Sequence, residues 1–116
     1  PNAICFNALL DAWARSGRKD AGEKAEQTLE WMQQLCDSEG LDTAPNEISF
    51  NSCIYAWANS PLPHAAVHAE AVLQRMISKY QQGSNVAPTQ VSFGSAMNAW
   101  ANSGLPQAPD NAQETT

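Results

Sequence analysis

Four polar side chains recur at matching distances along the chain and could recognise a ligand through hydrogen bonds. Asn7 and Asn51 lie 44 residues apart, and Asn46 and Thr89 lie 43 residues apart. An asparagine amide carries both donors and an acceptor, so it can distinguish partners by the pattern of polar atoms that they present. The alternative from the residues alone is that Asn46 and Thr89 only cap helices and that Asn7 and Asn51 face solvent.

No catalytic or metal-binding pattern stands out in the sequence. His64 and His68 are four residues apart and could share a helix face, but no cysteine or carboxylate completes a metal-binding set with them. We therefore interpret both as surface or core histidines. Cys5, Cys36 and Cys53 are odd in number and lack paired metal spacing, which indicates reduced thiols. We predict no enzymatic activity, no metal or cofactor and no small-molecule substrate.

The four polar residues belong to a sequence block that occurs three times. The block spans 16 residues and begins at Pro1, Pro45 and Pro88, and every copy contains Phe, Ala-Trp-Ala and a final Ser at the same positions. Self-similarity at a nearly constant period is typical of stacked supersecondary units.

A second block, with the pattern Ala-Glu followed by Leu and Met, begins at Ala25 and again at Ala69. It keeps the 44-residue period of the first block. The third copy would begin close to the last residue, so we expect the chain to be part of a longer array. We divide it into repeat 1, repeat 2 and a truncated repeat 3 with a frayed tail, at residues 1–44, 45–87 and 88–116.

The first block of each repeat is predicted to form an amphipathic helix, called helix A. In repeat 1 its apolar residues follow the three-and-four spacing of one helix face. A proline and a good N-cap residue precede it in every copy, and Ser-Gly or Ser-Pro ends it. The apolar residues of this face in repeat 1 are Phe6, Leu9, Leu10 and Trp13, and the three N-cap residues are Asn2, Asn46 and Thr89.

The second block is predicted to form a second helix, called helix B. In repeat 1 it starts with a capping box of Asp20 and Glu23 and ends near Leu35. In repeat 2 it starts near Pro63, because proline is tolerated in the first turn of a helix. We therefore predict an all-α fold, a right-handed superhelical α-solenoid of antiparallel helix pairs in the order A1-B1-A2-B2-A3, with the recurrent Trp filling the space between pairs.

The charge of the chain is acidic but unevenly distributed. Twelve acidic and six basic residues give a net charge of −6, which taken alone argues against a polyanionic partner. Most of the acidic residues lie in helix B of repeat 1 and in the linker after it, whereas the first blocks hold only Asp11 and Glu47. No apolar run approaches the roughly 20 residues of a membrane span, so we predict no membrane partner.

Helix A opens with Ile4-Cys5-Phe6-Asn7 in repeat 1 and Ile48-Ser49-Phe50-Asn51 in repeat 2, helix B carries Ala-Glu…Leu…Met, and Pro-Asn or Pro-Thr closes each repeat. With these residues the chain resembles the pentatricopeptide repeat family, over nearly its whole length to about Ser103. Its period of 43 or 44 residues is longer than usual for that family. The surplus falls mainly in the linkers between repeats, and loops absorb such insertions at low cost.

Members of this family bind single-stranded RNA, with one base per repeat read by two or three side chains. The resemblance implies that Asn7 with Asn46 reads one pyrimidine, favouring C with some U, and that Asn51 with Thr89 reads another. It implies that Gly94 leaves repeat 3 without a reading side chain. The further residues that it implies are Ile4, Ile48 and Val91 for sandwiching the bases and Arg15 for contacting phosphate.

The spacing along helix A is consistent with these implied roles. Ile4, Asn7, Asp11 and Ala14 form a semi-polar stripe distinct from the apolar face, and Ile48, Asn51, Tyr55 and Ala58 repeat it in repeat 2. We expect the stripe to line a groove.

The resemblance implies a segment of an RNA processing, stability or translation factor of a mitochondrion or plastid. The alternative is a tetratricopeptide-like scaffold that binds a protein partner, as a peptide, in its concave face. The acidic balance and the scarcity of basic residues favour this alternative. A more remote one is an RNA-processing enzyme whose catalytic domain lies outside this sequence.

Overall fold

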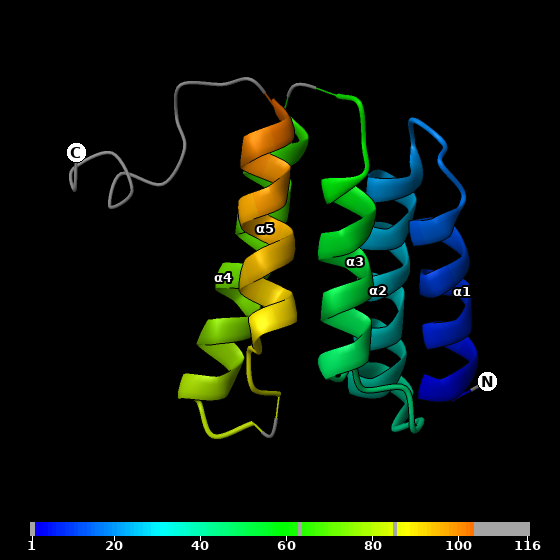
Figure 1. The fold of residues 1–116 in the computed structure, drawn as a ribbon. Coiled ribbons are helices and arrows are strands. Elements are labelled where there is room, and N and C mark those ends of the chain that lie inside the picture. The colour runs from blue at the N-terminus through cyan, green and yellow to red at the C-terminus, as the bar shows by residue number, and fades with distance from the viewer. Residues whose placement is uncertain (1, 63, 85, 104–116) are drawn as a thin grey trace.

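Five α-helices follow one another in the computed structural model, which describes residues 2–62, 64–84 and 86–103 (Figure 1). The described residues are all helix, turn and loop, as the sequence predicts for an all-α chain. The start expected at Pro63 and the tail of repeat 3 lie outside the described residues. The helices are α1 (Ala3–Arg15), α2 (Ala21–Glu39), α3 (Glu47–Ala58), α4 (Ala65–Gln81) and α5 (Gln90–Ser103).

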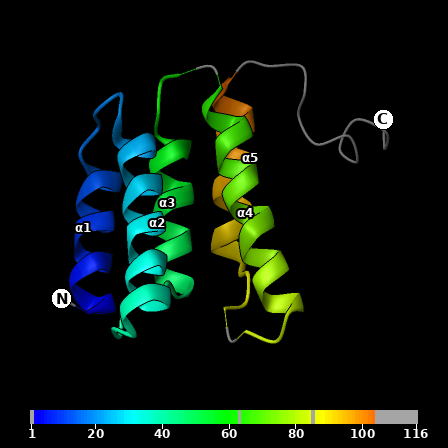
Figure 2. The same ribbon diagram turned by 180° about the vertical axis from the view of Figure 1, so that it is seen from behind.

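The helices stand side by side with repeat-like contacts (Figures 1 and 2). Helix α3 is the centre of the arrangement, since it contacts α1, α2, α4 and α5. In addition, α1 contacts α2, and α4 contacts α5. Helices α1, α3 and α5 therefore form a continuous row, and α2 and α4 pack against that row. Among the described helices, none has both the length and the apolar character of a membrane span.

Polar residues fix the starts of three helices. Asn2 Oδ1 accepts a hydrogen bond from the Cys5 amide at 3.1 Å, and Asn46 Oδ1 accepts one from the Ser49 amide at 3.1 Å. At α5, Thr89 Oγ1 accepts from the Ser92 amide at 3.4 Å. These bonds satisfy amides of the first turn that have no partner within the helix, so the three predicted N-caps are confirmed.

The predicted capping box at the start of α2 is wrong. Asp20 is the N-cap residue, but its side chain makes no capping hydrogen bond. Its carboxylate instead pairs with Arg18 Nε at 3.0 Å, and this ion pair lowers the pKa of Asp20. An arginine two residues away competes with the backbone amides for the same oxygens.

The buried face of α1 differs by one position from the predicted face. Phe6, Leu10 and Ala14 are buried, whereas Leu9 is 40% exposed. Residues four apart lie on one face of a helix, and Leu9 is turned by about 100° from Leu10. In α2, Ala25, Leu29 and Met32 are buried and Cys36 is half-buried.

Tryptophan fills the space between α2 and α3, as predicted. Trp57 is only 3% exposed, and its ring lies so close to Gly22 that an added Cβ there would be 2.4 Å from the ring. Its Nε1 donates a hydrogen bond to Glu26 at 3.0 Å, and Trp100 Nε1 donates to Glu70 at 2.8 Å in the same manner. The two recurrent sequence blocks are thus joined by a recurrent Trp–Glu hydrogen bond.

Candidate functional site

Three large aliphatic side chains are exposed on the row of helices α1, α3 and α5. Ile4 is 77%, Ile48 is 58% and Val91 is 61% exposed. Each lies in the first turn or two of its helix, where the N-cap holds the backbone. The three residues to which the resemblance assigns contacts with bases therefore present apolar surface to solvent on the three helices of the row.

Asn7 and Asn46 form a hydrogen-bonded pair that joins α1 to the start of α3. Asn46 must turn its oxygen toward Ser49, because the Ser49 amide can only donate. The same oxygen accepts from Asn7 Nδ2 at 3.1 Å, and Asn7 Oδ1 in turn accepts from Ser49 Oγ at 2.5 Å. The network fixes the orientation of both amides.

Asn51 is held by a corresponding network between α3 and the start of α5. Ser92 Oγ accepts from the Thr89 amide at 3.0 Å, and its own proton goes to Asn51 Oδ1. Ser92 therefore stands between Asn51 and Thr89. The structure therefore brings Asn7 into direct contact with Asn46 and links Asn51 to Thr89 through a serine.

The serines in these networks belong to the candidate site and were not predicted from the sequence. Ser49 and Ser92 are completely buried and each bonds both an N-cap residue and the asparagine of the preceding row helix. The two serines are 43 residues apart, which matches the repeat period, and this recurrence could have indicated them. Cys5 occupies the corresponding position in α1 and is exposed.

The amino groups of Asn46 and Asn51 remain available to a ligand. Asn51 Nδ2 and Asn46 Nδ2 have no hydrogen-bond partner within the part of the chain that the structure describes, whereas both oxygens are engaged. Asn7 is half-buried, as is Asn51, and Asn46 is exposed. Asn46 and Asn51 therefore display mainly hydrogen-bond donors.

A groove of about 240 Å³ runs along the row of helices beside Asn51. Its wall includes Asp11 and Arg15 from α1, Asn51 and Tyr55 from α3, and Val91 from α5. Three of these belong to the semi-polar stripes that the helical spacing predicts. The stripes of two successive helices thus face one groove.

Arg15 supplies the positive charge of this groove. Its Nε donates to both carboxylate oxygens of Asp11 at 3.0 Å, and that hydrogen bond, with the charge of Asp11, raises the pKa of the guanidinium. Arg15 and Asp11 side chains are 75% and 54% exposed. The Nη groups of Arg15 make no hydrogen bond within the described residues, so they can meet an anion without breaking the Asp11 contact.

The third helix of the row, α5, lacks a side chain at the position of the two asparagines. Gly94 occupies the place that Asn7 and Asn51 hold on α1 and α3, and an added Cβ would have no atom within 4 Å. The third copy therefore has space for a side chain at this position but does not carry one.

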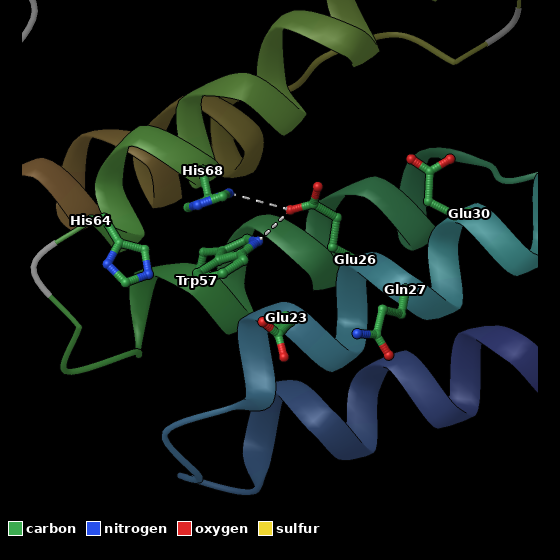
Figure 3. Close-up of a pocket in the computed structure, with 7 residues that line it drawn as sticks. All are labelled: Glu23, Glu26, Gln27, Glu30, Trp57, His64 and His68. Carbon is green, nitrogen blue, oxygen red and sulfur yellow. Dashed lines mark hydrogen bonds and ion pairs between the residues drawn. The ribbon is translucent and has the colours of Figure 1, made fainter.

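A second hollow, of about 190 Å³, lies where α2 and α4 meet beside Trp57 (Figure 3). Glu23, Glu26 and Glu30 line one side, and His64 and His68 line the other. The His68 ring stacks on the Trp57 ring with 4.4 Å between the ring centroids, and His68 Nδ1 lies 3.8 Å from Glu26 Oε1. His68 therefore contributes to packing. Within the described residues, no three His, Cys, Asp or Glu side chains are arranged to hold a metal ion.

The cysteines differ in accessibility. Cys53 is buried, and burial raises the pKa of its thiol, whereas Cys5 is exposed and Cys36 is half-buried. All three are free thiols. Cys53 is thus protected from reagents as long as the helices stay packed.

No protein-family model, curated protein or solved structure matches this chain.

Proposed function

We propose that the chain is a segment of an α-solenoid of antiparallel helix pairs that binds single-stranded RNA along the row of α1, α3 and α5. The observation that carries this proposal is the recurrence of one arrangement. In this arrangement, an asparagine amide is held by hydrogen bonds to the start of the next helix of the row and lies near an exposed aliphatic side chain. The pairs are Asn7 with Ile4 and Asn51 with Ile48. Such an array matches the way helical-repeat proteins read one base per repeat.

The orientation of the amides favours cytosine above uracil. Asn46 and Asn51 offer amino groups because their oxygens are used within the protein. Cytosine presents two adjacent acceptors, N3 and O2, on its pairing edge. Uracil has a donor, N3–H, between its acceptors, so only one of the two N–H donors of an asparagine amino group finds an acceptor on that edge. This preference has the same order as the one implied by the resemblance.

The backbone contact proposed for Arg15 is weak. One exposed arginine stands in this groove, and its charge is shared with Asp11. For single-stranded nucleic acids, the logarithm of the binding constant falls linearly with the logarithm of the salt concentration. Each phosphate contact contributes about −0.7 to the slope. We therefore expect a slope of about −0.7, much shallower than that of basic RNA-binding proteins.

By the same resemblance we propose that the segment belongs to an RNA processing, stability or translation factor of a mitochondrion or plastid, and we assign no catalysis to it. The alternative is a scaffold for a peptide. The acidic hollow formed by Glu23, Glu26 and Glu30, together with the net charge of −6, favours a basic peptide in that case.

Asn51→Ala should weaken binding to oligo(rC) by about five- to hundredfold and reduce the preference for oligo(rC) over oligo(rA), because a good pair of hydrogen bonds to a base edge discriminates by about this factor. Fluorescence anisotropy with labelled octamers at a stated low salt concentration measures both quantities. Asn7→Ala should act in the same direction.

The matched control is Gln74→Ala, which removes an exposed amide from α4, away from the row. It should leave binding unchanged. If the wild-type chain binds no oligonucleotide, or if Gln74→Ala weakens binding as much as Asn51→Ala, the proposal is wrong. Saturable binding of a lysine-rich peptide instead of RNA would support the scaffold alternative.

A further inference from the structure

Tyr55 is an aromatic residue on the row that the base-reading pairs do not include. It follows Asn51 by one helical turn on α3, so the two side chains share a face. Its neighbours Ile54, Ala56 and Trp57 are buried, but Tyr55 is 46% exposed. The ring therefore stays at the surface of a helix whose other large apolar residues nearby are in the core.

The groove gives the ring a specific setting. Tyr55 shares the wall of the groove with Asn51, Val91 and Arg15. The volume of the groove, about 240 Å³, is below the roughly 300–1,000 Å³ typical of pockets for drug-sized ligands. Single-stranded nucleic acids are bound by this combination of groups: an aromatic face for a base, an amide for the base edge and a cation for the backbone. A free phosphate would make no use of the ring.

We propose that Tyr55 packs its ring against the nucleotide whose base edge is bound at Asn51. This inference rests on the proposed RNA-binding function and adds a residue to it. The contact is specific to one position of the RNA, because the corresponding residue is Asp11 on α1 and Asn98 on α5. Neither of those side chains can stack on a base, and Asp11 carries a charge that repels phosphate.

The test compares Tyr55→Leu and Tyr55→Phe with the wild-type chain in titrations with oligo(rC). Loss of the ring should weaken binding by about five- to hundredfold. Tyr55→Phe should stay within about twofold of wild type. The matched control is Tyr80→Leu, because Tyr80 is 55% exposed on α4 and lies outside the groove. Its affinity should equal that of the wild type.

A second readout separates stacking from a change of fold. A base on the face of an aromatic ring has its H5 and H6 proton signals shifted upfield, and this shift should disappear with Tyr55→Leu while remaining with Tyr80→Leu. Binding that needs Asn51 but is indifferent to Tyr55→Leu overturns the inference and leaves the proposed function standing. Equal loss with Tyr55→Phe also overturns it, since the hydroxyl would then be the contact. Absence of any binding to the wild type contradicts both.

Discussion

Trp57→Ala is expected to lower the free energy of unfolding by about 3–5 kcal/mol, the range for removing a large aromatic side chain from a core. The ring is 3% exposed, packs against Gly22 and stacks on His68. Its loss leaves a cavity between α2 and α3 and takes the indole donor from Glu26. Since whole domains are stable by only about 5–15 kcal/mol, most of the stability should be lost. Urea denaturation followed by circular dichroism at a helix band measures the change.

Trp31→Ala is the matched control for this prediction. Trp31 is 53% exposed, and its ring contact is an edge-to-face pair with Phe6 at 5.1 Å. The loss of that pair should cost about 0.5–1.5 kcal/mol. If both variants lose the same stability, the recurrent tryptophan does not hold the helices together. The labelling rate of the buried Cys53 thiol provides an independent measure of opening.

Gly22→Ala and Gly94→Ala should change stability in opposite directions. Both glycines lie within helices, where alanine is favoured by about 1 kcal/mol. At Gly94 the new methyl group meets no atom within 4 Å, so this gain should be realised. At Gly22 it would lie 2.4 Å from two carbon atoms of the Trp57 ring. Overpacking of a core costs about 1–3 kcal/mol, so the net effect there should be a loss.

Thermal denaturation of the two variants in parallel provides the measurement, with a higher midpoint for Gly94→Ala and a lower one for Gly22→Ala. Each kcal/mol shifts the midpoint by about 4–8 °C in a domain of 60–100 residues. An increase for both substitutions would show that Trp57 moves aside freely, and the close packing of α2 against α3 would then carry no stability.

Helices and their caps were predictable because their signals are local. The Asn2, Asn46 and Thr89 caps lie next to the amides that they bind, and the period repeats each signal. The failures came from competition between near neighbours. Arg18 takes the carboxylate of Asp20 away from the helix start, and the rotation of α1 leaves Leu9 outside the core.

The links between row helices were only partly predictable. The Asn7–Asn46 and Asn7–Ser49 bonds span 39 and 42 residues, and no local pattern reports on such distances. The resemblance supplied the pairing, but it did not indicate the buried serines. Thr89 has a shorter side chain than Asn46, and in its network Ser92 bonds both Thr89 and Asn51. A difference of this kind depends on side-chain length and on helix placement together.

The proposed RNA binding requires the amino groups of Asn46 and Asn51 to bind the edges of RNA bases. The most direct test is a titration of the isotope-labelled chain with oligo(rC), in which the side-chain amide signals of these two residues are followed by NMR. We predict saturable shifts of both signals, larger with oligo(rC) than with oligo(rA). The side-chain amide signal of Gln74 on α4 should not shift. Shifts confined to residues around the acidic hollow, or none at either asparagine, would contradict the account.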